Sequence, residues 1–305
     1  MLDGTLIEGP KVLGEVVNRV IGKIARHVLE SCTKGAFSTG DETVLGLYQS
    51  FYQKLQFRDR SLPRPWVFTT NYDLFNERAM DRRGIPYCNG FSGVVERRFN
   101  PAMFRYSLAE QLDIGSRRWS AVDGFIYLGK LHGSVNWIED DETLFPVREL
   151  ADVPPSVDRR VLIYPTPAKQ SASFVSPYAD LFREFQTRVV QDQSVLVVIG
   201  YGFGDQHINN IIFQALTIPN FRLIIFAGAD ATGSVAELRK LGDPRVWHIG
   251  SEHSCVRPAH HFNAFVERFM PELPGTKIEN AVEKVLNSLI SKQAESGKGG
   301  ENGHG

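Results

Sequence analysis

The sequence predicts an α/β protein with a parallel sheet, helices on both faces of that sheet and a smaller inserted subdomain. Short, continuously apolar runs alternate with segments of helical periodicity, a pattern typical of parallel strands that are buried on both faces. Three of these runs end in polar or glycine-rich sequence where an ordinary turn would suffice. At 305 residues the chain is long enough for one large domain of this class with a smaller insert.

Two amphipathic helices precede the first predicted strand. Apolar residues recur at three- and four-residue steps between Val12 and Leu29, which gives the first helix a continuous apolar face. A second helix is predicted over residues 42–56, with Tyr48 among its inward-facing residues. Residues 35–40 begin and end with glycine and separate the two helices.

Five apolar runs are predicted as strands, and a sixth run closes the series. The runs are residues 66–70, 124–131, 161–164, 195–199, 223–226 and 246–249. Helices over residues 178–190 and about 205–216 separate the third, fourth and fifth runs, and a further helix is predicted over about 259–269. This alternation predicts that the strands pair in parallel.

The chain is predicted to form a single domain over residues 1–290. Residues 81–160 mix short β-like runs with Gly, Pro and Arg, and we assign the smaller subdomain to them. Residues 291–305 are polar and glycine-rich and have no apolar face to bury, which predicts disorder.

The charge balance gives no reason to expect nucleic acid or an anionic membrane as the main partner, because 34 Lys and Arg stand against 35 Asp and Glu. Arginine pairs at residues 82–83, 97–98 and 117–118 are expected to be solvated surface. No apolar run approaches the ~20 residues that span a membrane, and no basic segment followed by an apolar one marks a leader. The protein is therefore expected in the cytoplasm.

The three cysteines, Cys32, Cys88 and Cys255, are odd in number and widely separated. This spacing argues against a disulfide framework and fits a reducing compartment. No C-x-x-C pair exists, which excludes a four-thiolate zinc site within this chain. His253 and Cys255 belong to no paired ligand motif, and no metal site is predicted.

The candidate site lies where three predicted strands end, because ligands of open α/β sheets bind beyond the carboxyl ends of the strands. The three segments are Thr69-Thr70-Asn71-Tyr72-Asp73, Lys130-Leu131-His132-Gly133-Ser134 and Gly200-Tyr201-Gly202-Phe203-Gly204-Asp205. Each segment also has a purely structural explanation. Asn71 and Asp73 could cap the following helix, and His132 could be a hydrogen-bonded turn residue. Glycines after a strand are by themselves weak support for phosphate binding.

In combination and in this order, the three motifs resemble those of the Sir2 superfamily. FTTNYD (residues 68–73) resembles its T-x-N-x-D segment, and KLHGS (residues 130–134) resembles its histidine–glycine segment. VVIGYGFGDQHIN (residues 197–209) is similar to the strand–loop–helix of the bacterial Sir2-like branch, where G-[YF]-x-[FL]-x-D-x-x-[IL] replaces the G-T-S of protein deacylases. The resemblance covers about residues 60 to 250 and implies a Rossmann-like, Sir2/DHS-like NAD-binding fold.

The resemblance also implies residue roles. The Asn71 side chain would lie near the ribose carbon bonded to nicotinamide and orient an incoming water, and His132 would contact ribose hydroxyls and accept a proton. Asp73 would hold the nicotinamide carboxamide or the ribose. The other residues implied to bind the nucleotide are Thr70, Gly200, Tyr201, Gly202, Phe203 and Asp205. The nicotinamide ring of NAD is positively charged and leaves as a neutral molecule, so positive charge develops on the ribose in the transition state. A pocket that positions water and stabilises this charge can therefore cleave the bond.

Two departures from the family pattern bear on function. Sir2 proteins usually begin with a strand and a G-A-G-x-S-like loop that cradles phosphates, and MLDGTLIEGP at residues 1–10 has no such loop. Either this chain begins downstream of that element or the phosphates are bound differently. The second departure is the absence of the four zinc cysteines of protein deacylases, which makes water the expected acceptor and predicts no zinc.

The expected function is an NAD hydrolase that yields ADP-ribose and nicotinamide, of the type that bacterial Sir2-like proteins use in antiphage defence. The alternative is a non-catalytic module that binds NAD or ADP-ribose, and a deacylase is the third reading. Because NAD depletion harms the host, family analogy predicts homo-oligomers or a regulatory partner protein, with an ATPase as one candidate.

Overall fold

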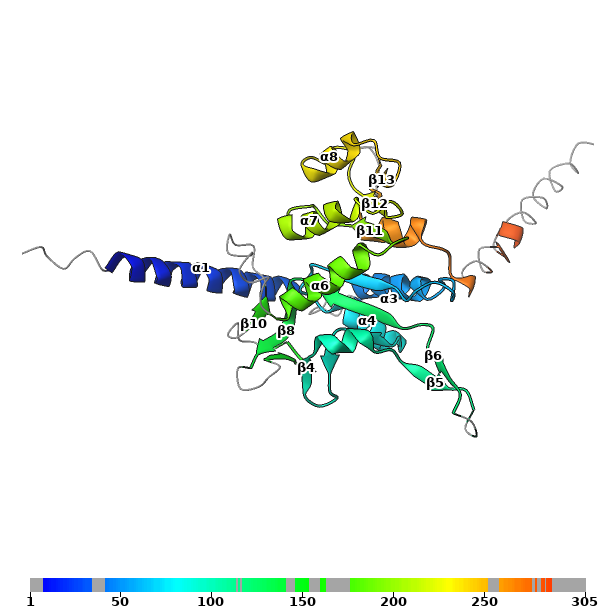
Figure 1. The fold of residues 1–305 in the computed structure, drawn as a ribbon, viewed down its shortest axis with the longest axis horizontal. Coiled ribbons are helices and arrows are strands. Elements are labelled where there is room, and N and C mark those ends of the chain that lie inside the picture. Colours follow the sequence, from blue (N-terminus) through cyan, green and yellow to red (C-terminus); the bar gives the residue numbers. More distant parts are fainter. Residues whose placement is uncertain are drawn as a thin grey trace, which may run out of the picture.

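The computed structural model describes residues 8–34, 42–113, 115, 117–140, 146–153, 160–162, 176–251, 258–275, 278, 281–282 and 284–286. Within these residues, helices and strands alternate along the chain, and helices pack against the sheets of parallel strands (Figure 1). The predicted α/β fold class is confirmed. The predictions for residues 35–40 and 291–305 fall outside the described residues.

The five predicted helices are present, three of them within one residue of the expected ends, and two further helices, at residues 75–83 and 234–240, had no predicted bounds. The helices are α1 (Glu8–Thr33), α3 (Thr43–Leu55), α4 (Phe75–Arg83), α6 (Tyr178–Val189), α7 (Gln206–Ala215), α8 (Ser234–Lys240) and α9 (Phe262–Ala264). The helix expected over 259–269 is shorter than predicted, because α9 passes directly into a π-helical turn, η2 (Phe265–Phe269). A 3-10 turn, η1 (Pro101–Arg105), was not predicted.

The parallel strands form two three-stranded sheets. One has the order β1-β7-β2 and the other the order β11-β12-β13. Their strands are β1 (Trp66–Thr69), β2 (Tyr87–Cys88), β7 (Ile126–Lys130), β11 (Val195–Ile199), β12 (Arg222–Phe226) and β13 (Val246–Ile249). Helix α6 contacts β7 of the first sheet and also α7, the helix that follows β11 of the second sheet. It therefore packs between the elements of the two sheets (Figure 1).

Alternation along β7 explains how helices cover both faces of the first sheet. Ile126 and Leu128 pack in a cluster with residues of α3 and α4. Tyr127 points to the opposite face, where the Phe68 ring meets Phe185 of α6 edge-on at 4.9 Å between ring centroids. Both faces are buried, as the continuously apolar sequence indicates.

A third, antiparallel sheet follows β7 directly, with the order β10-β8-β9-β4-β3. Its strands are β3 (Phe91–Ser92), β4 (Arg97–Phe99), β8 (Gly133–Glu139), β9 (Val147–Glu149) and β10 (Arg160–Leu162). The run at 161–164 was expected to pair in parallel, and this expectation is wrong, because β10 pairs antiparallel with β8. The antiparallel strands β3, β4, β8 and β9 all come from residues 81–160, the segment that the sequence marked as weakly patterned. A short hairpin of β5 (Ala109–Gln111) and β6 (Trp119–Ala121) stands apart from it.

Two expectations about exposure are corrected by the structure. Arg97 and Arg98 are not simply solvated, since their guanidinium groups pair with Glu149 at 2.6 Å and Asp140 at 3.1 Å. Strand β11 reads as fully buried in the sequence, yet Val195 is 57 % exposed because β11 forms an edge of its sheet among the described residues. Apolar sequence alone does not distinguish an edge strand from a central one.

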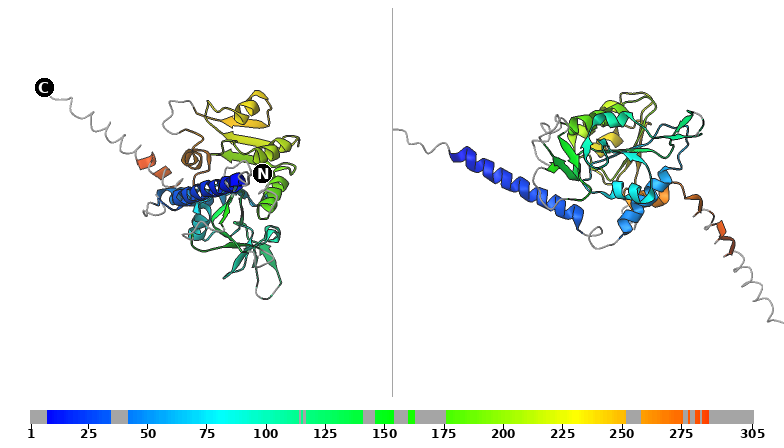
Figure 2. Two further views of the ribbon diagram at one scale, coloured as in Figure 1. Left: turned by 90° about the vertical axis from the view of Figure 1, so that its left-hand side faces the viewer. Right: turned by 90° about the horizontal axis from the view of Figure 1, so that it is seen from below.

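Helix α1 extends away from the other described elements (Figure 2). Its carboxyl end packs on the body, where Leu29 forms a small cluster with Leu74 and Val135. Within the described part of the chain, neither α1 nor any other helix is both long enough and apolar enough to cross a membrane.

Gly129 permits the close packing of β7 against β1. A Cβ at this position would lie 2.6 Å from Cδ1 of Phe68. The Gly129→Ala substitution is expected to destabilise the protein by about 1–3 kcal/mol, because the Phe68 ring is held by neighbours on both sides. Urea denaturation measures this change.

Gly46→Ala in α3 is the matched control, since a Cβ there meets no described atom within 4 Å. It is expected to raise stability by about 0.5–1 kcal/mol through helix propensity. Equal effects of the two substitutions would contradict the packing argument.

Candidate functional site

The three predicted segments come together at the carboxyl ends of their strands. Strands β1 and β7 are parallel neighbours with Thr69 opposite Lys130, so the segments that follow them leave the same edge of the sheet. The segment after β11 joins them through a contact of 3.1 Å between Nε2 of His132 and Oδ2 of Asp205. Residues far apart in the sequence thus line one region.

Residues 70–74 connect β1 to α4 and are called the Asn71 loop. The Asn71 backbone N–H donates to Oγ1 of Thr69 at 3.0 Å, and the Asn71 side chain is exposed. The Asp73 carboxylate accepts from the backbone N–H of Phe75 at 3.1 Å, at the start of α4. The capping alternative therefore applies in part to Asp73. Thr70, the residue before Asn71, is half-buried.

Tyr48 of α3 is a neighbour of this loop that sequence reasoning did not assign to the site. Its ring stacks on Phe75, with 5.4 Å between centroids. Burial raises the pKa of Tyr48, the Asp73 carboxylate raises it further, and a hydrogen bond with the Asn71 side chain acts in the opposite direction. The phenol is therefore neutral near pH 7 and can hold the Asn71 amide. The only sequence signal was the inward position of Tyr48 on its helix.

His132 lies at the turn where the chain passes from β7 into β8. Gly133 follows with φ of +86°, a conformation that favours glycine and makes this abrupt turn possible. The His132 side chain is buried and paired with Asp205, 73 residues away in the sequence. Its partner is therefore a residue of another strand end, not of its own turn.

Asp205 is fixed on both of its carboxylate oxygens. Oδ1 accepts from the backbone N–H groups of His207 at 2.9 Å and Ile208 at 3.4 Å, which caps α7, and Oδ2 faces His132. Because a carboxylate only accepts hydrogen bonds, His132 donates from Nε2 and keeps its lone pair on Nδ1. The pair thus prepares Nδ1 to take up a proton.

The glycine-rich loop between β11 and α7 presents backbone to the outside. Gly200 has φ of +66°, and a Cβ on Gly202 or Gly204 would meet no described atom within 4 Å. The loop is held against α7, because the Tyr201 hydroxyl donates to Oδ1 of Asn209 in that helix at 2.9 Å. Its exposed glycine backbone leaves room for a nucleotide to approach closely.

The structure limits how Phe203 and Asp205 could take part in nucleotide binding. The Phe203 side chain is buried in the core and its φ is +54°, so only its backbone can face a ligand. The first N–H groups of α7 already bond to Asp205, so a phosphate would meet the loop backbone rather than the helix end. Among the described residues, no cluster of three or more His, Cys, Asp or Glu side chains could hold a metal ion. His253 and Cys255 are outside the described residues.

Comparison with known proteins connects this geometry to a family. A family model described as SIR2-like domain matches residues 65–241, which is more than half of the chain. All three segments of the site lie within the matched region. A search of curated proteins found no match to this chain.

Proposed function

The chain belongs to the family of SIR2-like domains, and from this membership we propose that it hydrolyses NAD to ADP-ribose and nicotinamide. Family membership relates the chain to NAD chemistry in general. The observation that favours hydrolysis is that an exposed Asn71 and a buried His132 follow the neighbouring parallel strands β1 and β7, and that His132 is held by Asp205.

The proposed reaction uses these groups in a simple sequence. Asn71 orients a water molecule whose oxygen attacks the ribose carbon bonded to nicotinamide. The carbon–nitrogen bond breaks, its electron pair returns to the nicotinamide ring, and nicotinamide leaves as a neutral molecule. Nδ1 of His132 takes the proton of the attacking water, and Asp205 stabilises the imidazolium that forms.

Charge near the site supports this reaction. The transition state carries positive charge on the ribose, and preorganised negative groups stabilise such charge more strongly in a partly buried site than in water. The Asp73 carboxylate lies beside the Asn71 loop and is held by the Phe75 N–H. Gly202 and Gly204 supply the open backbone that would accommodate the phosphates.

A module that binds NAD or ADP-ribose without cleaving it is the second candidate, and the open glycine loop would serve it equally well. The buried His132–Asp205 pair favours the enzyme, since binding alone does not require a proton acceptor. A deacylase has less support because the three cysteines of the sequence cannot form a four-thiolate zinc site.

The proposal extends to regulation by analogy with the family. By this analogy we propose a role in bacterial antiphage defence, in the cytoplasm. An enzyme that depletes NAD harms its own cell, and its activity therefore needs to be controlled. Homo-oligomerisation or a partner protein, with an ATPase as one candidate, would supply the control.

The test is nicotinamide release from NAD by the purified chain, with ADP-ribose measured in the same chromatogram. Equal amounts of both products are expected, and His132→Ala should lower the rate by about 10²–10⁴-fold because the proton acceptor is lost. His27→Ala, an exposed histidine of α1, is the matched control and should leave the rate unchanged.

Two results would contradict the hydrolase. Folded protein that binds NAD and releases no nicotinamide would identify the binding module. Formation of an acylated ADP-ribose with an acylated peptide would identify the deacylase.

A further inference from the structure

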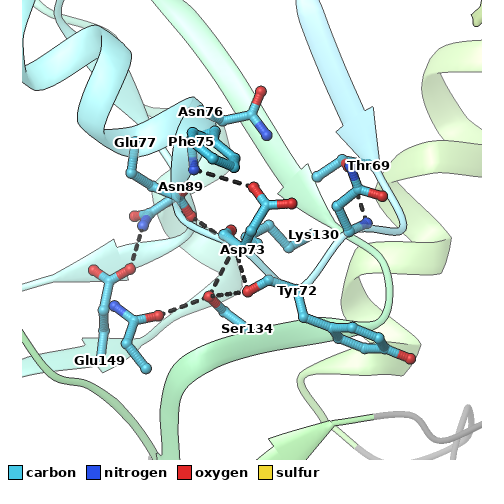
Figure 3. Close-up of polar contacts among 12 residues, drawn as sticks. Thr69, Tyr72, Asp73, Phe75, Asn76, Glu77, Asn89, Lys130, Ser134 and Glu149 are labelled. Carbon is cyan, nitrogen blue, oxygen red and sulfur yellow. Dashed lines mark hydrogen bonds and ion pairs between the residues drawn. The ribbon is translucent and has the colours of Figure 1, made fainter. Parts of the chain in front are cut away.

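Lys130 is a fully buried lysine directly beneath the Asn71 loop, and its side chain is 0 % exposed. A buried ammonium group is costly unless oxygen atoms surround it. Four oxygens do so here. Nζ lies 2.8 Å from Oγ of Ser134, 3.3 Å from the carbonyl oxygen of Tyr72 and 3.1 Å from Oε1 of Glu77, and it also donates to the carbonyl oxygen of Asp73 (Figure 3).

Two of these oxygens belong to the backbone that immediately follows Asn71. The Tyr72 carbonyl also accepts from the backbone N–H of Val135 at 3.0 Å. On the other side of Asn71, the Thr69 carbonyl accepts from the backbone N–H of Leu131 at 2.9 Å. The loop is thus tied to the end of β7 and to β8 on both sides of Asn71. Lys130 makes two side-chain hydrogen bonds of that connection, and the Ser134 hydroxyl adds a longer one to the Tyr72 carbonyl at 3.4 Å.

Glu77 supplies the counter-charge from the first turn of α4. Its carboxylate is buried, and Lys130 is its ion-pair partner. Burial raises the pKa of Glu77, and the Lys130 ammonium acts against that rise. When both groups are ionised, they bring no net charge under a site whose proposed transition state is cationic.

Stability alone does not account for this arrangement. Replacing a buried ion pair by apolar or neutral groups of similar size is often neutral or stabilising, whereas removing one partner leaves an unpaired buried charge. An apolar side chain at position 130 would fill the same space but could not donate to the Tyr72 and Asp73 carbonyls.

We propose that Lys130 is a positioning residue that holds the Asn71 loop, with Glu77 as its counter-ion, so that the Asn71 amide stays in place for the reaction. This inference rests on the proposed NAD hydrolysis. It assigns Lys130 no contact with substrate, since its ammonium is enclosed by the loop, β8 and α4.

The test compares Lys130→Met and Glu77→Gln with the double variant Lys130→Met/Glu77→Gln. Each single variant leaves one buried charge unpaired and is expected to lower Tm, while the double variant should recover most of that loss. Positioning predicts that kcat nevertheless stays about 10²-fold below wild type in the double variant, because displacement of a catalytic group by ~1 Å has an effect of this size. KM for NAD should change by less than about threefold, since the Gly200–Asp205 loop is untouched.

Hydrogen exchange gives a readout that does not depend on turnover. In the double variant, the peptide that contains Asn71 and Phe75 should exchange about tenfold faster, with peptides of α7 unchanged. Val235→Ala on α8 is a control for general destabilisation and should lower Tm without slowing turnover. A double variant with wild-type exchange in this peptide, or with kcat within threefold of wild type, would overturn the inference. If the wild-type chain releases no nicotinamide, the proposed function fails while the exchange result still decides the role of Lys130.

Discussion

Replacement of Asn71 by alanine is expected to lower kcat for nicotinamide release by about 10²–10³-fold, which is the size of effect seen when one preorganised polar group is removed from a reacting centre. The amide is exposed at the end of β1 and makes its contact with Tyr48 of α3. Its loss removes the group that we propose to orient water and leaves the backbone of the loop in place. The change is measured by product chromatography at saturating NAD.

The structure offers a matched control for this substitution. Asn210 on α7 is exposed and outside the three strand-end segments, so Asn210→Ala should leave kcat unchanged. Because Lys130 and not the Asn71 side chain holds the Tyr72 and Asp73 carbonyls, Asn71→Ala should also keep the wild-type Tm. An Asn71→Ala variant with wild-type turnover would remove Asn71 from the proposed reaction.

Asp205→Asn is expected to lower kcat by about 10²–10⁴-fold, comparable to the loss of the orienting acid in other histidine-based sites. The reason is geometric. Oδ1 caps α7 by accepting from two backbone N–H groups, so an asparagine that keeps this cap must turn its NH₂ group toward His132. Nε2 would then accept a hydrogen bond, the proton would reside on Nδ1, and Nδ1 could no longer take a proton from water.

Stability separates this explanation from loss of the cap. Asparagine caps helices about as well as aspartate, so the free energy of unfolding should change by less than about 1 kcal/mol. Asp59→Asn is the matched control, because Asp59 also accepts a local backbone N–H, from Ser61, on an exposed turn. Full activity in Asp205→Asn would show that His132 does not act as the proton acceptor.

Periodicity and apolar runs were sufficient to predict most helices, five of the six strands of the two parallel sheets and the fold class, whereas the two-residue strand β2 was missed. These features depend on local sequence, because the side-chain spacing of a helix or strand follows directly from its backbone. The polar residues at strand ends were also recognisable, and the SIR2-like match covers all three of them. The roles assigned to Asn71, His132 and the glycine loop remain predictions.

Contacts between distant segments could not be predicted. Strand β10 is antiparallel because its neighbour in the sheet is β8. Val195 is exposed because β11 lies at the edge of its sheet among the described strands. The sequence around Tyr48 describes only a helix face, and that around Lys130 only a strand end. Their partners, Asn71 and Glu77, become visible only when the chain is folded.

The proposed function requires that the ends of β1, β7 and β11 form one NAD site. A crystal structure of the Asn71→Ala variant with NAD would locate this site, because the variant should bind the dinucleotide and cleave it slowly. We expect the nicotinamide ribose between position 71 and His132, with the pyrophosphate against the backbone of Gly202 and Gly204. NAD bound elsewhere on the protein, or its absence from these strand ends at saturating concentration, would rule out the proposed site.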